Sequence, residues 1–246
     1  FQKQIPFKLT SSQKKCIEEI YNDIKKASPM KRLLQGDVGS GKTIVAAAAV
    51  TATIKNNKQA ALMAPTEVLA EQHLTSFKKY LEYFDVDIHL LTSSVKDRED
   101  IYEIIDRGDP VLIIGTHALI QDKVNFNNLG LAIIDEQERF GVEQRKKLVD
   151  NDDFTPHQLV MSATPIPRTT ALAIYGDLEL SVIDELPPGR KKIKSRVLSG
   201  GKRDNKEVYE AAYEHLKNDS QIFVVCPYIE ESENSDIKAA ENVFKL

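Results

Sequence analysis

Residues 36–43 read Gly-Asp-Val-Gly-Ser-Gly-Lys-Thr, which is the spacing of a loop that binds phosphate. Its glycines allow backbone bends at which a Cβ would clash, so successive N–H groups can point at anionic oxygens. In such a loop Lys42 contacts the β- and γ-phosphates, and the Thr43 hydroxyl is a ligand of Mg²⁺. We therefore expect the whole loop to hold a nucleoside triphosphate. Its residues are Gly36, Asp37, Val38, Gly39, Ser40, Gly41, Lys42 and Thr43.

The residues on either side favour this interpretation over an ordinary glycine-rich turn. A short extended run, residues 30–35, precedes the loop. The apolar, alanine-rich residues 43–50 predict a helix whose N-terminus faces the phosphates, where backbone N–H groups attract anions. A strand before and a helix after are the context that the motif requires.

A pair of acidic residues, Asp135 and Glu136, follows the apolar residues 129–134. Mg²⁺ keeps several waters and takes one or two carboxylates together with phosphate oxygens. We expect Asp135 to hold Mg²⁺, mostly through water, and Glu136 to orient or deprotonate the attacking water. An acidic pair by itself is usually a solvated turn, but a phosphate loop earlier in the chain favours catalysis. The candidate catalytic residues are Lys42, Thr43, Asp135 and Glu136.

Two residues near the N-terminus could recognise the base of the nucleotide. The amide of Gln13 both donates and accepts hydrogen bonds, as adenine recognition requires, and Phe7 could stack on the ring. The alternatives are a helix-cap neighbour for Gln13 and a core aromatic for Phe7.

Further polar residues occur where apolar segments end. Ser162 and Thr164 could link the nucleotide site to whatever lies across from it, or they could form an ordinary strand-to-helix turn. Other hydroxyls and backbone amides would suit contacts with a phosphodiester backbone, which position nucleic acid without reading its sequence. Simple helix caps are the alternative for these residues. They are Thr66, Glu67, Gly115, Thr116 and His117.

The elements that must position these residues alternate between apolar strands and helices. The predicted strands are residues 30–35, 59–64, 86–91, 111–114, 129–134 and 158–161, and the predicted helices are 10–28, 43–50 and beyond, 68–83 and 96–107. Strands that are apolar throughout indicate a parallel sheet covered on both faces, hence an α/β fold. Ligands of such sheets bind at the carboxyl ends of the strands, where every motif above occurs.

The last part of the chain has the pattern of a second, incomplete α/β unit. Residues 186–192 resemble a linker, and they precede a possible strand at 193–198, a helix at 206–216 and a strand at 221–226. The chain begins without Met and stops within a predicted helix, so we expect a fragment of a longer protein.

The composition limits the class of protein. Hydrophobic residues make up 41% and charged residues 28% of the 246 residues, as in globular proteins. No apolar run has the length of a membrane span, so we expect no membrane partner. The net charge of −4 excludes a uniformly basic nucleic-acid coat. Cys16 and Cys226 have no partners at metal-ligand spacing, so we expect reduced core cysteines of a cytosolic protein.

The motifs occur in the order found in superfamily 2 helicases, which the chain resembles. Residues 9–13 resemble the Q motif, 36–43 motif I, 64–67 motif Ia, 114–117 motif Ib, 135–138 motif II and 162–164 motif III. Longer runs resemble one family, the bacterial RecG helicases of branched DNA. These runs are residues 34–43, 64–73, 139–145, 163–169, 184–190 and 225–232.

The resemblance implies a RecA-like P-loop NTPase domain at residues 1–188 and the truncated start of a second such domain at 189–246. It implies an enzyme that uses ATP and Mg²⁺ to translocate on double-stranded DNA at stalled forks and Holliday junctions in recombination and repair. Residues that couple hydrolysis to movement would be Glu138, Arg139, Ser162 and Thr164. The resemblance also implies a bacterial, cytoplasmic protein that reaches the nucleoid through DNA.

Two parts of that family are missing from this sequence, a wedge domain that engages the junction and the remainder of the second RecA-like domain. The latter carries an arginine that reaches the γ-phosphate, and such an arginine contributes a factor of about 10³–10⁵ in rate. We therefore expect the chain alone to bind ATP, to hydrolyse it slowly and not to unwind DNA.

The same residues are compatible with other functions. The transcription-repair coupling factor Mfd is similar in the phosphate loop and in the run around 165–168. A non-hydrolysing nucleotide-binding module and a structural P-loop protein are also possible. Glu138 stands where RecG helicases have a histidine that connects the γ-phosphate to motif III. A glutamate accepts hydrogen bonds and repels phosphate, so this departure affects coupling more than nucleotide binding.

Overall fold

The structure is a computed structural model of residues 1–246, which describes residues 1–96, 98–136, 140–141, 148, 155–164, 178–187, 195–198 and 202–225, with backbone only at 202–205. Its strands are β1 Lys31–Gly36, β2 Gln59–Met63, β3 Asp87–Leu91, β4 Val111–Gly115, β5 Leu129–Asp135, β6 His157–Ser162 and β7 Glu179–Ile183. Its helices are α1 Ser11–Ile24, α2 Lys42–Lys55, α3 Glu67–Leu81, α4 Glu99–Arg107, a 3₁₀ helix His117–Ile120 and α7 Lys202–Lys217.

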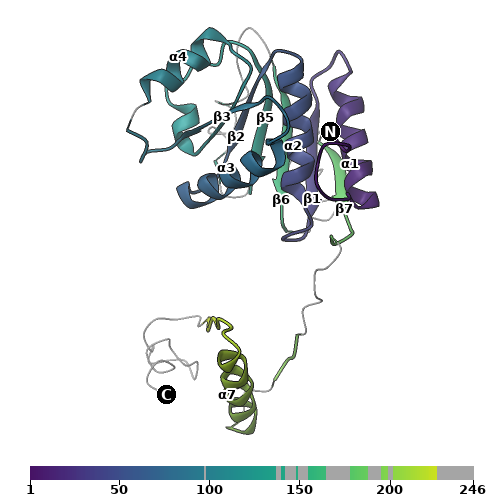
Figure 1. Cartoon of the computed structure of the whole chain (residues 1–246), viewed down its shortest axis with the longest axis vertical. Helices are drawn as coiled ribbons and strands as arrows, with labels where there is room; N and C mark the ends of the chain where they lie inside the picture. The colour runs from purple at the N-terminus through teal and green to yellow at the C-terminus, as the bar shows by residue number, and fades with distance from the viewer. Residues whose placement is uncertain are drawn as a thin grey trace. The chain divides into compact units, whose positions relative to one another are not determined.

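The described strands form one parallel sheet in the order β3-β4-β2-β5-β6-β1-β7 (Figure 1). The predicted α/β fold with a parallel sheet is therefore confirmed. Since all strands run the same way, their carboxyl ends lie at one edge of the sheet. There β6 separates β5 from β1, so the ends of these three strands are neighbours.

Helices cover both faces of the sheet, as strands that are buried on both sides require. Helices α1, α2 and α3 pack on one face, in a core that includes Ile17, Val45 and Phe77. Helix α4 packs on the other face through Ile101 and Ile105. Helix α2 is apolar over almost its whole circumference because it lies between the sheet and its neighbours α1 and α3.

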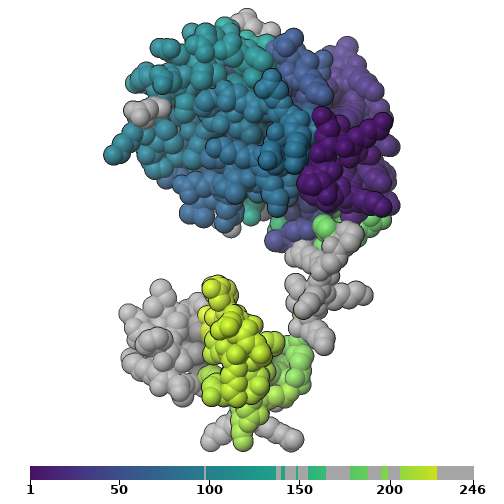
Figure 2. All heavy atoms as spheres, viewed as in Figure 1, coloured from purple at the N-terminus to yellow at the C-terminus, as the bar shows by residue number. Residues whose placement is uncertain are grey.

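The segment before α1 packs against α3. Phe1 stacks on Phe84 with ring centroids 5.2 Å apart, and the edge of Phe7 meets Tyr80 at 6.0 Å. Figure 2 shows these first residues, in the darkest purple, lying on the surface against the blue α3 region. Contacts with residues that are distant in the sequence thus hold the N-terminal segment in place, just before the first turn of α1.

The pattern of the sequence located most elements, with four differences. Helix α1 ends at Ile24, earlier than the residue before Pro29. Strand β7 was not predicted, because its residues alternate between exposed and buried instead of forming an apolar run. Residues 195–198 and 221–225 are not strands, although strands were predicted at 193–198 and 221–226. The described residues 221–225 are exposed, and none of the strands in the described part of the chain pairs with them. The 3₁₀ helix after β4 was also not predicted.

Contacts divide the chain into two compact units, Phe1–Arg190 and Lys191–Leu246. The first unit contains the sheet and the helices that pack on it. The second contains α7, whose predicted bounds of 206–216 fall inside the helix. The assignment of the second unit to a second RecA-like domain stays a prediction. Cys16 is buried, as predicted, and Cys226 lies outside the described residues.

Candidate functional site

The candidate phosphate loop joins the end of β1 to the start of α2, at the carboxyl edge of the sheet. Gly39 and Gly41 have positive φ values of 74° and 94°, which glycine adopts without steric cost. A Cβ at Gly41 would lie 2.3 Å from Nε2 of Gln13, so any other residue would displace the Gln13 side chain as well as strain the backbone. The loop therefore has both the backbone conformation and the position at a helix N-terminus that phosphate binding needs.

The side chain of Lys42 turns into the loop from the first residue of α2. Its Nζ donates hydrogen bonds to the carbonyl oxygens of Gly36, at 2.6 Å, and Asp37, at 3.2 Å. Burial lowers the pKa of Lys42, while the nearby carboxylates of Asp135, Asp37 and Glu136 act in the opposite direction. The ammonium thus lies close enough to Asp135 and Glu136 to interact with both charges.

Asp135 is the last residue of β5, and Glu136 follows it with a left-handed backbone, φ 49°. The N–H of Glu136 donates to Oδ1 of Asp135, at 3.1 Å, and to the carbonyl of Met161 in β6, at 3.0 Å. For a residue other than glycine, the left-handed conformation costs about 1 kcal/mol or more. The change of backbone direction also makes the side chains of the two adjacent residues point in different directions. The backbone therefore turns between the two acidic residues, which suits two distinct roles.

Two oxygen groups suited to Mg²⁺ lie at the carboxyl edge of the sheet. They are the carboxylate of Asp135 and the hydroxyl of Thr43. Among the described residues, no group of three or more His, Cys, Asp or Glu side chains could hold a metal ion. Mg²⁺ takes few protein ligands and completes its shell with water and phosphate oxygens. The residues present therefore fit a magnesium ion that arrives with a nucleotide.

Gln13 connects α1 to the phosphate loop. It is the third residue of α1, 3% exposed; Oε1 accepts from the N–H of Thr10 at 2.9 Å, and Nε2 donates to the carbonyl of Ser40 at 2.7 Å. Gln13 thus takes part in the helix cap, which the sequence offered as the alternative to adenine recognition. Each amide atom keeps a second hydrogen or lone pair, so adenine recognition stays a prediction.

Phe7 is 41% exposed, so it is not the core aromatic that was the alternative prediction. Its ring meets Tyr80 of α3 edge-on, near the start of α1. A partly exposed ring that is held by a neighbour can offer a face to a base, and this role also stays a prediction.

Ser162 and Thr164 hold each other at the end of β6. Their hydroxyl oxygens are 3.0 Å apart, and the N–H of Thr164 donates to Oγ of Ser162 at 3.2 Å. Because β6 lies between β5 and β1, this pair lies between the strand ends that carry Asp135 and Gly36. The other two candidate coupling residues, Glu138 and Arg139, lie outside the described residues.

The candidate DNA contacts on α3 differ from each other. Thr66 is the N-cap of α3 and accepts a hydrogen bond from the N–H of Leu69 at 3.3 Å, so it acts as a helix cap while remaining exposed. Hydrogen bonds from Ser93 and then Ser94 hold the pKa of Glu67 below its usual value. Glu67 therefore faces the loop after β3 as an ionised side chain, which fits an internal bond better than a phosphate contact.

Three candidates lie at the end of β4 and directly after it. Gly115 packs so closely that a Cβ would lie 2.2 Å from the carbonyl oxygen of Leu91 in β3. Thr116 is 7% exposed and is mostly withdrawn from solvent, whereas His117 is exposed, with its ring centroid 5.5 Å from that of Phe140. Of these three, His117 has the exposed side chain, and its contact with DNA stays a prediction.

Sequence reasoning missed His73, which lies in α3. Its Nε2 is 2.7 Å from Oδ2 of Asp135. The buried residues of α3 are Ala70, His73, Phe77 and Leu81, so His73 is the polar member of an otherwise apolar face. That break in the pattern was the available signal.

Sequence reasoning also missed a contact of Glu185, which follows β7. Its Oε2 accepts hydrogen bonds from the N–H groups of Ser11, at 2.9 Å, and Ser12, at 3.4 Å. The first turn of α1 has no acidic residue of its own, so the positive end of this helix receives its carboxylate from elsewhere.

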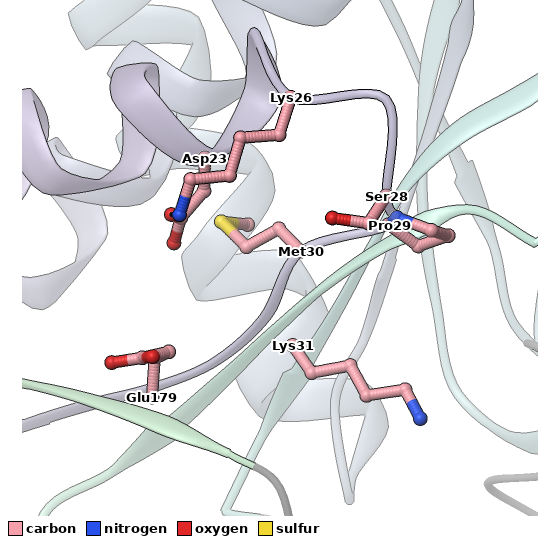
Figure 3. Close-up of a pocket in the computed structure, with 7 residues that line it drawn as sticks. All are labelled: Asp23, Lys26, Ser28, Pro29, Met30, Lys31 and Glu179. Atoms are coloured by element: carbon pink, nitrogen blue, oxygen red, sulfur yellow. Dashed lines mark hydrogen bonds and ion pairs between the residues drawn. The ribbon is translucent and has the colours of Figure 1, made fainter.

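A pocket of about 240 Å³ lies at the opposite edge of the sheet. Its lining includes Lys31 and Glu179, the first residues of β1 and β7. In Figure 3 the Lys26 ammonium lies against the Asp23 carboxylate at its rim, 2.7 Å away. Because the phosphate loop begins where β1 ends, this pocket is separate from the candidate nucleotide site.

Comparisons with known proteins agree with this arrangement. A model of the DEAD/DEAH box helicase family matches residues 10–173. The chain is 49% identical to the ATP-dependent DNA helicase RecG of Aquifex aeolicus over 98% of its own length and 31% of the relative's. It is 47% identical to the RecG helicase of Bacillus subtilis, over 100% of its own length and 36% of the relative's. The chain thus spans about a third of the relatives it matches.

Solved structures show the same likeness. A structure of RecG bound to a three-way DNA junction has a TM-score of 0.77 and 43% identity, over 88% of this chain and 29% of the other. A DEAD box protein of Methanococcus jannaschii, at 22% identity and a TM-score of 0.53, shares the fold. In the described part of this chain, no helix has the length and apolar character to span a bilayer.

Proposed function

Because the chain belongs to the DEAD/DEAH box helicase family, we propose that it is the ATP-binding part of a RecG-type DNA helicase that acts on branched DNA. Residues 1–188 would form the first RecA-like domain and 189–246 the start of the second. The relatives named above are RecG helicases, which favours this function over that of a transcription-repair translocase.

The observation that carries the proposal is that the phosphate loop and the acidic pair lie at the same edge of the sheet, where the charges of Asp135 and Glu136 act on the pKa of Lys42. The phosphate loop and the acidic pair come from strands β1 and β5, which only β6 separates. A cation for the phosphates and carboxylates for a metal and a water are the parts that phosphoryl transfer to water needs. If the phosphate loop and the acidic pair lay at opposite edges of the sheet, these groups could not act on one nucleotide.

In this proposal each residue has a distinct role. Lys42 and the backbone amides of the loop bind the β- and γ-phosphates, and the carbonyl oxygens that Lys42 now contacts keep its ammonium in place. Thr43 and Asp135 would hold Mg²⁺, which supplies positive charge against the phosphate oxygens. Glu136 orients the attacking water and accepts its proton. Ser162 and Thr164, beside the acidic pair, pass the state of the site on to the rest of the enzyme.

DNA binding rests on the exposed groups at the same edge and on the relative that is bound to a three-way junction. Thr66 and His117 are the exposed candidates for contacts with the phosphodiester backbone. Such contacts would give affinity for DNA without sequence preference. They would also bring the DNA to the edge of the sheet that carries the candidate nucleotide site.

The test measures nucleotide binding and turnover by the 246-residue chain. A fluorescent ADP analogue should bind in the presence of Mg²⁺, and Lys42→Ala should weaken this binding by about tenfold or more, as loss of a charge-assisted contact predicts. Single-turnover hydrolysis of ATP should be measurable in wild type and lost in Glu136→Gln, which should still bind nucleotide. Nucleotide binding without hydrolysis, in wild type as in Glu136→Gln, would instead identify a non-hydrolysing nucleotide module.

A second measurement addresses the DNA substrate. Fork DNA should raise the affinity for nucleotide more than linear duplex of equal length and ionic strength does. A response to neither DNA would contradict the proposed substrate while leaving nucleotide binding intact.

A further inference from the structure

We propose that His73 is a positioning residue, which holds the carboxylate of Asp135 in the orientation that binds Mg²⁺ together with the nucleotide. The inference rests on the proposed function, because it gives Asp135 the role of a metal ligand. It adds a residue from α3 to a site otherwise built from β1, α2 and β5.

The Asp135 carboxylate is fixed at both of its oxygens. Oδ2 meets Nε2 of His73 at 2.7 Å, and Oδ1 accepts from the N–H of Glu136 at 3.1 Å. An ionised carboxylate can only accept, so Nε2 of His73 is the donor. Since each oxygen has a further lone pair, the two bonds set the plane of the carboxylate and still leave positions for a metal ion or its water.

His73 is itself held rigidly. It is 8% exposed, and its ring packs edge-on against Phe77, with centroids 6.3 Å apart and planes at 63°. Phe77 is 0% exposed and belongs to the core between α3 and the sheet. The imidazole therefore cannot swing away without disturbing the core, and a fixed donor gives the carboxylate a fixed orientation.

The charge of Lys42 explains why Asp135 needs such a holder. The two opposite charges are close enough to interact, yet the ion pairs among the described residues do not include one between them. Lys42 instead donates to loop carbonyls, and Asp135 is held by His73. Without His73 the carboxylate would be free to turn towards the ammonium, and both groups would then be withdrawn from the magnesium nucleotide.

The experiment compares nucleotide affinity with and without Mg²⁺. The fluorescent ADP analogue is titrated into wild type, His73→Leu and His73→Gln, once in Mg²⁺ and once in EDTA. Loss of a residue that orients a metal ligand typically costs about 10- to 100-fold in metal affinity. We expect His73→Leu to reduce the gain in affinity due to Mg²⁺ by about tenfold or more. Its affinity in EDTA should stay close to that of wild type.

Two comparisons make the result specific. His73→Gln retains an N–H donor in place of the imidazole donor and should recover most of the magnesium-dependent gain. His89 also pairs with a carboxylate, that of Asp87 at 2.9 Å, but it lies on β3. His89→Leu is therefore the matched control and should leave both affinities unchanged. Thermal unfolding of each variant verifies that it is folded.

The outcomes separate this inference from the proposed function. Equal losses in Mg²⁺ and in EDTA, or a His73→Gln variant no better than His73→Leu, would show a merely structural histidine and overturn the inference. A wild-type affinity for nucleotide that does not depend on Mg²⁺ would overturn the proposed metal site itself. If His73→Leu does not fold, the comparison of His73→Gln with wild type decides, and a tenfold loss in that variant would overturn the role of the donor.

Discussion

Glu185 and Ser11 are 174 residues apart in the sequence, and the carboxylate of one accepts a hydrogen bond from the backbone N–H of the other at 2.9 Å. This contact fixes the segment after β7 to the first turn of α1. The same turn carries Gln13, which bonds to the phosphate loop at Ser40. The start of the connection to the second unit and the candidate nucleotide site therefore share one helical turn.

Replacing Glu185 should weaken α1. A carboxylate at a helix N-terminus contributes about 0.3–1 kcal/mol when exposed, and we expect Glu185→Ala to lower the free energy of unfolding by about that amount. Urea denaturation at low and high salt would measure it. Glu185→Gln is the control, because it keeps an acceptor and loses the charge. A loss independent of salt in both variants would contradict the helix-dipole explanation.

Replacing Gln13 tests the recognition of adenine. If its free lone pair and N–H read the base, Gln13→Ala should weaken ATP binding by about tenfold, or 1.4 kcal/mol, and should weaken GTP binding much less. Competition of both nucleotides against the fluorescent ADP analogue measures this difference. Equal losses for ATP and GTP would mean that Gln13 acts only through Thr10 and Ser40.

The pair of Arg32 and Asp23 should dominate the stability of the β1–β7 edge. Both are almost fully buried, at 6% and 5% exposed, and Arg32 Nη2 lies 2.6 Å from Asp23 Oδ2. Removing one partner from a buried ion pair costs about 3–5 kcal/mol when the other charge is left unpaired. In Arg32→Leu, Asp23 keeps Lys26 at 2.7 Å, so thermal or urea unfolding should show a smaller loss, of about 1–3 kcal/mol. The double variant with Asp23→Leu should recover part of it, and a double variant that is worse than Arg32→Leu alone would contradict this account.

This pair also predicts a dependence on acid. Burial alone would raise the pKa of Asp23, but hydrogen bonds from Lys26 and Arg32 bring it below the ordinary value of 3.8. A lowered pKa contributes stability that is complete above pH 3.8 and is lost as the pH falls through the folded-state value. The free energy of unfolding should be measured for wild type and the double variant from about pH 5 to about pH 2. It should fall more steeply with decreasing pH in wild type.

His157 should make the protein less stable in mildly acidic solution. Burial, and then the charge of Lys58, lower its pKa below 6.5, while Asp23 acts in the opposite direction. Its Nδ1 accepts from the N–H of Met30 at 2.9 Å, which requires the neutral ring. The stability that the neutral His157 ring contributes is therefore complete above pH 6.5 and is lost as the pH falls through the folded-state pKa.

The variant His157→Gln keeps an acceptor but does not titrate. Unfolding free energies measured from about pH 7.5 to 5 should fall more steeply in wild type than in the variant. Identical slopes would show that the ring stays neutral without cost, or that it is protonated in the folded state as well.

The sequence by itself determined the local structure and the parts of the site that lie close together in the chain. The phosphate loop needs glycines, a lysine and a threonine at fixed spacing, so the residues that bear the chemistry were visible without coordinates. Runs such as residues 111–114 indicated buried parallel strands because such strands are apolar on both faces. The cap at Thr10 and Gln13 was indicated only in part, since the sequence did not show that Gln13 also reaches Ser40.

Tertiary structure decided what depends on strand order and on contacts between distant segments. The order of the sheet places Asp135 two strands from Gly36, and no local pattern specifies which strands become neighbours. His73 and Glu185 act through such contacts, so their roles had no signature in spacing. Strand β7 was missed because this edge strand does not form an apolar run. The strand expected at 221–226 is not formed over its described residues 221–225, since none of the described strands pairs with them. Local preference selects the elements, whereas the burial of their shared faces selects which residues meet.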